Sequence, residues 1–304
     1  MHDVIIIGGG PAGFSAALYS ARAKLDTLLI ERMISGGQMA TTDLMENYPG
    51  FEEPITGAVL ASHMEKQAKR FGTVIVKDNV VELKLDQEVK IVKTSNNVYK
   101  SKTVILCMGA FPKELGLQRE KELRGAGVSY CATCDGFFYK DRKVAVIGGG
   151  DTAAEDAIYL SRMCKKVYIV HRRDSLRAIK LLQNEIFNKE NIEIIWDSVV
   201  EEINGQLGVE SIKLKNVKTN SISNLEVDGM FVAVGYIPST QLVEGKIHLD
   251  EDKYIITDEK MQTNIKGVFA AGDIRKKVLR QVVTATSDGA IAASIAERYI
   301  SENS

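Results

Sequence analysis

One sequence pattern occurs twice in this 304-residue chain and limits its possible folds more than any other feature. A β-branched run at 4–7 leads into the turn GGGPAG at 8–13 and then into an alanine-rich stretch. The same order returns at 144–147, where the turn GGGDTA at 148–153 comes next, again with small residues at helical spacing after it. A strand, a glycine turn and a helix in succession are typical of doubly wound nucleotide-binding domains. The repeat therefore predicts an α/β chain with two Rossmann-like dinucleotide-binding domains.

A second repeated element indicates how these domains are joined. An apolar strand at 104–110 runs into Pro112, and another at 230–235 runs into Pro238. Because the chain has only 5 prolines, this equivalent placement suggests crossovers between domains. A last strand at 267–271 and a helix over about 287–299 need a sheet to join. We therefore expect a discontinuous domain of residues 1–112 and 241–304, with a second domain, 113–240, inserted into it.

Composition excludes several classes of protein. Lys and Arg number 39 against 40 Asp and Glu, so no broad basic surface is expected for nucleic acid or a membrane. The uncharged stretch 4–21 is broken by the first glycine turn and does not suit a membrane span. Four cysteines are too few for a disulfide-stapled secreted scaffold, and the N-terminal residues do not resemble a signal peptide. We expect a cytoplasmic protein.

The first glycine turn carries the fuller nucleotide fingerprint. Gly8, Gly10 and Gly13 form GxGxxG, with Pro11 and Ala12 inside it. The glycines permit the turn, the approach of backbone N–H groups to a pyrophosphate, and close packing of helix on strand. An acid, Glu31, stands at the end of the next apolar run, where it can bind a ribose hydroxyl. Alone, GxGxxG is often only a tight turn, but this context predicts a bound dinucleotide.

The second glycine turn differs from the first in the residues after its next strand. The turn contains Gly148, Gly150, Asp151, Thr152 and Ala153. After the strand at 166–170, no ribose-binding acid appears, and the residues there are His171, Arg172, Arg173 and Arg177. Guanidinium groups at this place suit a 2′-phosphate, which favours NADPH over NADH. The alternative is a solvated basic loop, and His171 could either touch the nucleotide or hydrogen-bond the turn.

Two cysteines have the spacing of a redox pair. Cys131 and Cys134 are separated by two residues, a spacing that allows a disulfide to form and reopen. A zinc half-site is the competing interpretation, but it needs a second close pair of ligands, and we expect no metal. Asp135 could donate a proton to a thiolate or serve as a cap or turn aspartate. The isolated Cys107, at a strand end, and Cys164, on a helix, are interpreted as small buried hydrophobes.

Taken together, these motifs resemble the low-molecular-weight (bacterial-type) thioredoxin reductases over essentially the whole chain. The motifs in order are 8–13, 36–38, 46–50, 131–135, 148–153, 171–177, 272–273 and 280–281. The resemblance implies a homodimeric flavoprotein that uses NADPH to reduce thioredoxin. It also implies domains of the three-layer ββα type, with FAD on the discontinuous domain and NADPH on the inserted one.

The same resemblance implies roles for individual residues. Cys134 would exchange electrons with the flavin, Cys131 would attack the thioredoxin disulfide, and Asp135 would be the acid. Asp273 and Gln281 would hold the flavin and its ribityl chain, with Asn47 nearby. Further residues that would bind FAD are Gly37, Gln38, Gly109, Gly272 and Arg280. Because the dithiol and the nicotinamide would share one domain and one flavin, the resemblance also suggests a domain rotation during turnover.

Two other functions fit parts of the sequence. One is a flavoprotein disulfide reductase that serves a peroxiredoxin or another thioredoxin-like protein. The other is a non-catalytic flavoprotein that senses nucleotides, although an intact CxxC argues against it. Glutathione-reductase-like enzymes carry a wider cysteine spacing near the first glycine turn and a histidine near the C-terminus, whereas the last histidine here is His248.

Overall fold

The computed structural model describes residues 1–32, 35–42 and 45–303. They form two compact units, one made of Met1–Phe111 and Ile237–Ser304 and the other of Pro112–Tyr236. The inserted unit begins at 112 where 113 was expected, and ends at 236 where 240 was expected. The chain passes between the units through β7 (Ala110–Pro112) and β16 (Tyr236–Pro238), which pair with each other, so each boundary falls inside or beside a paired strand.

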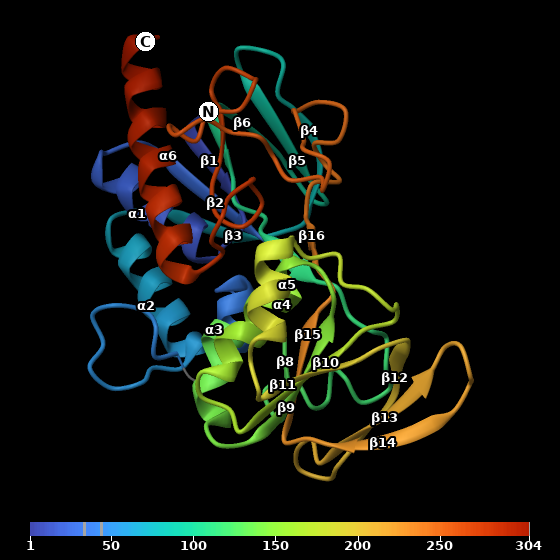
Figure 1. The fold of residues 1–304 in the computed structure, drawn as a ribbon. Helices are drawn as coiled ribbons and strands as arrows, with labels where there is room; N and C mark the ends of the chain where they lie inside the picture. Colours follow the sequence, from blue (N-terminus) through green and yellow to red (C-terminus); the bar gives the residue numbers. More distant parts are fainter. Residues whose placement is uncertain (33–34, 43–44, 304) are drawn as a thin grey trace. The chain divides into compact units, whose positions relative to one another are not determined.

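The discontinuous unit is built on a seven-stranded sheet (Figure 1). Its parallel part has the order β3-β2-β1-β6-β17. These strands are β1 (His2–Ile7), β2 (Thr27–Glu31), β3 (Val74–Lys77), β6 (Val98–Leu106) and β17 (Val268–Ala270). The antiparallel strands β4 (Val80–Lys84) and β5 (Lys90–Thr94) continue the sheet along the first half of β6. The central strands are buried on both faces, which is why they read as unbroken apolar runs.

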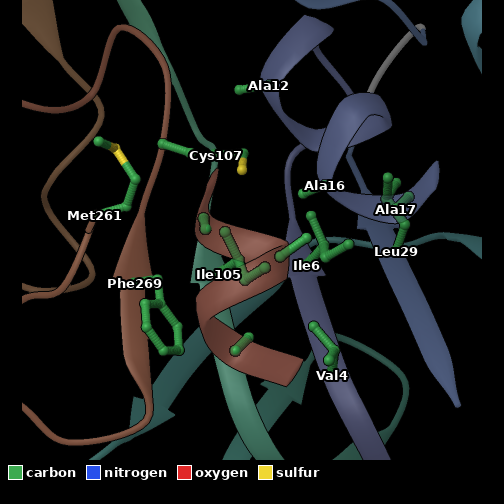
Figure 2. Packing of buried hydrophobic residues seen from close by; sticks show 14 of the residues in the cluster. Val4, Ile6, Ala12, Ala16, Ala17, Leu29, Ile105, Cys107, Met261 and Phe269 are labelled. Carbon is green, nitrogen blue, oxygen red and sulfur yellow. The ribbon is translucent and has the colours of Figure 1, made fainter. Parts of the chain in front are cut away.

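Small residues bring two helices close together against this sheet. The helices are α1 (Pro11–Arg22) and α6 (Val282–Glu302), while α2 (Gly57–Arg70) and the short helix η1 (Gly37–Thr41) complete the unit. A Cβ added to Gly289 of α6 would lie 2.1 Å from the Ala12 carbonyl oxygen, so only glycine fits there. Figure 2 shows the core, where Ile6 of β1 lies beside Ala16 of α1 and where Ile105 of β6 and Phe269 of β17 belong to the same cluster.

The last helix is longer than the sequence pattern suggested. We expected it to begin near residue 287, but α6 begins at Val282. A capping box explains the earlier start, because the Gln281 side chain accepts a hydrogen bond from the Thr284 N–H and the Thr284 hydroxyl accepts one from the Gln281 N–H. The cap compensates for the β-branched residues of the first turn, whose helix propensity is low.

The inserted unit has a parallel sheet of its own, with the order β11-β10-β9-β15-β8. Its strands are β8 (Val128–Ser129), β9 (Lys143–Gly148), β10 (Lys166–Val170), β11 (Ile192–Ile195) and β15 (Gly229–Ala233). Helices α4 (Asp151–Ser161) and α5 (Lys180–Phe187) belong to this unit, together with α3 (Ala132–Asp135) and η2 (Gly136–Tyr139). A separate antiparallel sheet contains β12 (Ser198–Asn204), β13 (Ser211–Asn216) and β14 (Ile222–Glu226).

In both units, the motifs come directly after the carboxyl ends of parallel strands. β1 and β17 run into the turns at 8–13 and 271–273, and β9 and β8 run into the turn at 148–150 and the cysteine pair. Ligands of doubly wound sheets bind at this edge. The chain is an α/β protein with two Rossmann-like domains, the second inserted into the first, as the repeat predicts.

Candidate active site

The first glycine turn packs tightly at Gly13 and has free space at Gly10. A Cβ on Gly13 would lie 1.8 Å from the Gly8 carbonyl oxygen, so this glycine allows α1 to start directly against β1. At Gly10 an added Cβ would meet no atom within 4 Å, which leaves room above the helix N-terminus. The Glu31 carboxylate accepts a hydrogen bond from the Gly9 N–H at 2.5 Å. The turn is therefore held by Glu31 and open to a ligand at Gly10.

A buried polar cluster comes after β17 in the same unit. Gly272 has φ +81° and lies against Ala12 of α1, where a Cβ would come within 2.8 Å of the alanine Cβ. The next side chain, Asp273, has an oxygen, Oδ1, that is buried without a hydrogen-bond partner among the described residues. Burial raises the pKa of Asp273, while Lys277 and Arg280 act in the opposite direction. Arg280 stacks 4.0 Å from the Tyr254 ring centre, and its Nε is likewise buried without a partner in the described chain.

Three further FAD candidates lie on short segments of this unit. Gly37 opens η1, and a Cβ there would stand 3.5 Å from the Cα of Gly10. Gln38 is the next residue of η1. Gly109 lies after β6 with φ +68° and no atom within 4 Å of an added Cβ. The structure therefore brings Gly37 against the first glycine turn.

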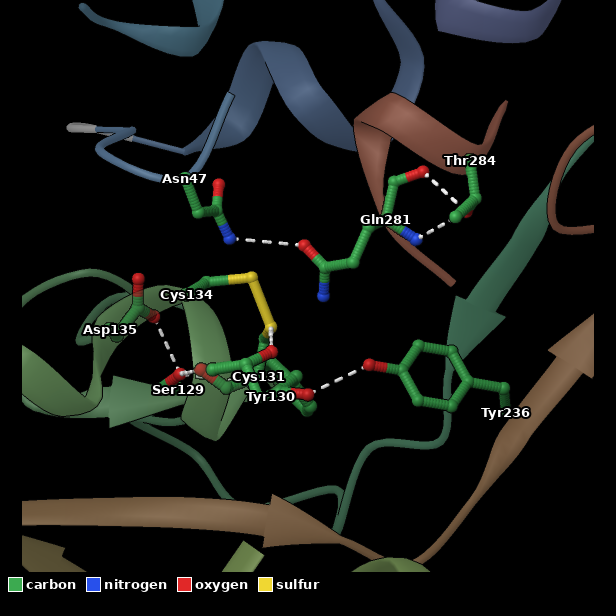
Figure 3. The surroundings of a disulfide bond; sticks show 10 residues. Asn47, Ser129, Tyr130, Cys131, Cys134, Asp135, Tyr236, Gln281 and Thr284 are labelled. Atoms are coloured by element: carbon green, nitrogen blue, oxygen red, sulfur yellow. Dashed lines mark hydrogen bonds between the residues drawn. A yellow bond between two sulfur atoms is a disulfide. The ribbon is translucent and has the colours of Figure 1, made fainter. Parts of the chain in front are cut away.

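Asn47 and Gln281 meet although 234 residues separate them in sequence. The Asn47 amide donates to the Gln281 side-chain oxygen at 3.1 Å, as Figure 3 shows. Gln281 is also the cap of α6, so one side chain links the helix N-terminus to the segment after η1.

The second glycine turn has the same open position. Gly150 has only Arg177 Nη2 near an added Cβ, at 3.8 Å. Gly148 and Ala153 lie against each other, with the alanine Cβ 2.7 Å from a Cβ added at 148. Asp151 begins α4 and accepts a hydrogen bond from the Ile179 N–H at 2.8 Å, which ties the turn to α5. Thr152 is the next residue and is exposed.

His171 lies under this turn and the arginines lie around it. The imidazole is 5% exposed and packs so closely on Gly149 that an added Cβ would lie 2.3 Å from the ring. Burial lowers the pKa of His171, although a hydrogen bond with the Ser175 backbone opposes the shift. Its Nε2 is buried with no partner among the described residues. The ring thus contacts the turn and keeps one nitrogen available, while Arg172, Arg173 and Arg177 are exposed.

The two cysteines form a disulfide at the carboxyl end of β8. Cys131 and Cys134 are bonded with a Cα–Cα distance of 5.3 Å, and Cys131 caps the one-turn helix α3 (Figure 3). Asp135 ends that helix and accepts a hydrogen bond from the Ser129 hydroxyl at 2.5 Å. The Thr133 hydroxyl lies 3.4 Å from the Cys131 sulfur. The structure therefore groups the disulfide, a carboxylate and two hydroxyls within one short segment.

A buried carboxylate fixes the chain just before the disulfide. Glu120 is 1% exposed and accepts hydrogen bonds from the N–H groups of residues 115–117 and from the Tyr130 hydroxyl. The Tyr236 hydroxyl donates to the Tyr130 carbonyl oxygen at 2.7 Å. Tyr130 directly precedes Cys131, so these contacts restrain the position from which the redox segment starts.

The other two cysteines have the character of unreactive thiols. Both are free and buried, and each lies in the segment that comes after an element, β6 for Cys107 and α4 for Cys164. Cys164, expected on a helix, in fact lies just beyond α4, because the helix ends at Ser161. Burial raises the pKa of Cys164 to about 11, with Asp141 adding to the shift, and it also raises the pKa of Cys107.

Several residues that shape the site carry no sequence motif. Asp288 of α6 accepts hydrogen bonds from Gly272 N–H at 3.0 Å, Arg275 Nε at 2.9 Å and Lys277 Nζ at 2.7 Å. Ser129, Glu120 and Tyr130 act in the same way around the disulfide. Sequence offers one weak signal for Asp288, because it is the one charged residue in the first half of α6, where small residues are frequent.

The described residues contain neither a cluster of metal ligands nor a membrane-spanning helix. Among them, no three His, Cys, Asp or Glu side chains are grouped as metal ligands. No helix in the described ranges is both long and apolar enough to cross a membrane.

Comparison with known proteins places this geometry in a family. Residues 2–289 match the model of the pyridine nucleotide-disulphide oxidoreductases. A thioredoxin reductase of Peptoclostridium litorale is 52% identical over 99% of this chain and 98% of its own length, and one of Peptoclostridium acidaminophilum is 50% identical over 100% and 98%. The crystal structure of thioredoxin reductase from Streptococcus pyogenes MGAS5005 is 44% identical, covers 99% of both chains and has a TM-score of 0.95. The chain belongs to the pyridine nucleotide-disulphide oxidoreductase family and, within it, to the thioredoxin reductases.

Proposed function

We propose that this chain is an NADPH-dependent flavoenzyme that reduces the disulfide of thioredoxin. The observation that carries the proposal is the Cys131–Cys134 disulfide, which comes after β8 at the same sheet edge as the second glycine turn. In the first half-reaction of the proposed enzyme, NADPH reduces this disulfide: disulfide + NADPH + H⁺ → dithiol + NADP⁺. In the second, the dithiol reduces oxidised thioredoxin, and the Cys131–Cys134 disulfide forms again.

The discontinuous unit fits FAD. Above Gly10 there is room for a pyrophosphate at the N-terminus of α1, where backbone N–H groups and the helix dipole favour an anion. The unpartnered oxygen of Asp273 and the unpartnered Nε of Arg280 supply an acceptor and a donor for the rest of the cofactor. Gln281 and Asn47 offer further amide groups. Bound FAD supplies two-electron transfer between a nicotinamide and a disulfide.

The inserted unit fits NADPH. The open position at Gly150 lies next to Arg177, and Arg172 and Arg173 are exposed at the end of β10. Guanidinium groups bind phosphate oxygens through paired hydrogen bonds, so they suit the 2′-phosphate. The buried Nε2 of His171 provides one more polar contact beside the turn.

The residues around the disulfide divide the thiol chemistry among them. Cys131 attacks the thioredoxin disulfide as a thiolate, and a mixed disulfide forms while one thioredoxin sulfur leaves. Cys134 then attacks the Cys131 sulfur, which releases reduced thioredoxin. Asp135 holds the proton that the departing sulfur takes up during reduction of the Cys131–Cys134 bond. Its position in the same one-turn helix supports this role.

We extend the proposal to assembly and location. The protein acts as a homodimer, as the family resemblance suggests, and sedimentation equilibrium of the FAD-loaded protein tests this. It works in the cytoplasm, because Cys107 and Cys164 are free thiols, as is usual in a reducing compartment. Fractionation of the producing cells tests the location.

Replacing Cys134 with serine tests the proposed reaction. The C134S protein should still bind FAD and accept electrons from NADPH, because both glycine turns are intact, but thioredoxin reduction should fall below detection. Cys164→Ser is the matched control and should keep near-normal turnover, since Cys164 is a buried free thiol. Steady thioredoxin reduction by C134S would refute the dithiol mechanism.

A further inference from the structure

The hydroxyl of Ser129 joins the redox helix to its acid. Ser129 ends β8, is 3% exposed and pairs in register with Phe231 of β15. Its Oγ donates to Asp135 Oδ2 at 2.5 Å and accepts a hydrogen bond from the Cys131 N–H at 3.1 Å. Figure 3 shows Ser129 between Asp135 and Cys131. One buried hydroxyl therefore contacts the carboxylate and the backbone of a redox cysteine at once.

We propose that Ser129 is a positioning residue for Asp135, which it holds against the Cys131 backbone in both protonation states of the carboxyl group. The inference deepens the proposed function, because it rests on Asp135 supplying the proton when the disulfide opens. No motif marks this serine, and its role is inferred only from these contacts.

The available partners allow the hydroxyl to serve both states. When Asp135 is ionised, the serine hydrogen points to Oδ2, in a charge-assisted bond, which is the stronger kind. When Asp135 carries the proton, its O–H can donate to Ser129 Oγ, and the serine hydrogen can turn to the Cys131 carbonyl oxygen, 3.4 Å away. A hydroxyl oxygen accepts two hydrogen bonds, so the Cys131 N–H contact persists in both states.

Ser129 therefore has a defined part in the balanced step. Reduction of the Cys131–Cys134 disulfide breaks the S–S bond, consumes NADPH and one solvent proton, and gives a dithiol and NADP⁺. The proton passes from Asp135 to the departing sulfur, after which Asp135 is reprotonated from solvent. Ser129 holds the carboxyl group in a fixed orientation through the step and is not itself consumed.

The test uses FAD-loaded full-length protein, four single variants and one double variant. Ser129→Ala removes the hydroxyl, and Ser129→Thr retains it. Ser161→Ala is the matched control, because Ser161 is also buried in the inserted unit, and its hydroxyl donates to the Ile158 carbonyl oxygen of its own helix. Asp135→Asn removes the acid and, combined with S129A, completes a double-mutant cycle. If S129A does not fold, Ser129→Cys replaces it, since a thiol is a poor donor of similar size.

The measurements are the single-turnover rate of disulfide reduction and the kcat and KM for thioredoxin. S129A should lower the single-turnover rate and kcat about tenfold. This loss is smaller than the roughly 10²–10⁴-fold that a general acid contributes, because the acid itself is still present. The KM for thioredoxin should not change, because Ser129 is buried and cannot touch a protein partner. S129T should recover most of the rate, and S129A should have no further effect when added to D135N.

Each other result is decisive. If S129A behaves like S161A while D135N is slow, Ser129 does not position the acid and the inference fails alone. If S129A and D135N slow the reaction additively, Ser129 acts through the Cys131 backbone, and the inference is again overturned. If D135N turns over at the parent rate, the proposed acid role itself is wrong.

Discussion

We propose that the guanidinium groups after β10 select NADPH over NADH. In the first glycine turn, the side chain at the end of the second strand is Glu31, and its carboxylate bonds the Gly9 N–H. At the equivalent place in the inserted unit, the backbone carries His171 and two exposed arginines. A carboxylate would repel a 2′-phosphate, whereas an arginine binds it through two hydrogen bonds.

Removing Arg172 and Arg173 should therefore weaken NADPH binding selectively. In the double alanine variant, the KM for NADPH should rise about 10- to 100-fold, the range expected for losing charge-assisted hydrogen bonds. The KM for NADH should change little, because NADH has no 2′-phosphate. Steady-state kinetics with both nucleotides measures this, and Arg162→Ala, an exposed arginine after α4, is the control. An equal rise for NADH would reduce the arginines to ordinary surface charge.

At the scale of elements, α4 carries a carboxyl group, that of Asp156, whose burial makes its ionised form unfavourable. Burial, and to a smaller degree the Glu155 carboxylate, raises the pKa of Asp156 to about 7. In the unfolded chain an aspartate titrates near 3.9. The folded state therefore binds the Asp156 proton more tightly than the unfolded state does. This difference in proton binding stabilises the folded state fully at low pH, and the stabilisation is lost as pH rises toward 7.

Asp156→Asn should consequently stabilise the protein in a pH-dependent way. At pH 8 the variant should be more stable by about 1–3 kcal/mol, because the asparagine is never ionised, and at pH 4 the difference should vanish. Thermal unfolding of the FAD-loaded proteins at several pH values measures the change. Glu185→Gln, at an exposed position of α5, should show no such profile. A gain that is constant from pH 4 to 8 would contradict the assignment to a titrating carboxyl group.

The sequence could predict those elements whose burial leaves a pattern. β1, β2, β9 and β10 are buried parallel strands, so each appears as an apolar run before a glycine turn or a charged residue. β8 has only two residues and leaves no periodicity. The start of α6 at Val282 depends on a capping box between Gln281 and Thr284, which the alanine pattern does not reveal.

The residues of the candidate site could likewise be predicted only where they leave a pattern in the local sequence. Cys131, Cys134 and the glycines stand in motifs and could be recognised from their spacing. Ser129 and Asp288 could not, because each acts through a contact that only the fold creates, and the Gly272–Asp288 bond spans 16 residues and two elements. Such contacts depend on how the strand end and the helix pack, which local sequence does not specify.

At the scale of the whole molecule, the chain contains two units of the same kind of fold that carry different polar groups. Each unit has its own parallel sheet and glycine turn, and each places its ligand groups at the carboxyl ends of its strands. Among the described residues, the inserted unit carries the disulfide, whereas the discontinuous unit carries Asp273 Oδ1 and Arg280 Nε, two buried atoms without a hydrogen-bond partner. Two nucleotide sites with different polar groups explain how one chain can use both a flavin and a nicotinamide.

The central claim is that electrons pass from NADPH through this chain to thioredoxin. An anaerobic titration of the FAD-loaded protein with NADPH, and separately with NADH, and then with oxidised thioredoxin, tests it most directly. NADPH should bleach the flavin absorbance at near-stoichiometric amounts, and NADH should require a large excess. Thioredoxin should then restore the absorbance and gain two thiols per disulfide. Bleaching by NADPH without recovery on adding thioredoxin, or no bleaching at all, would contradict the account.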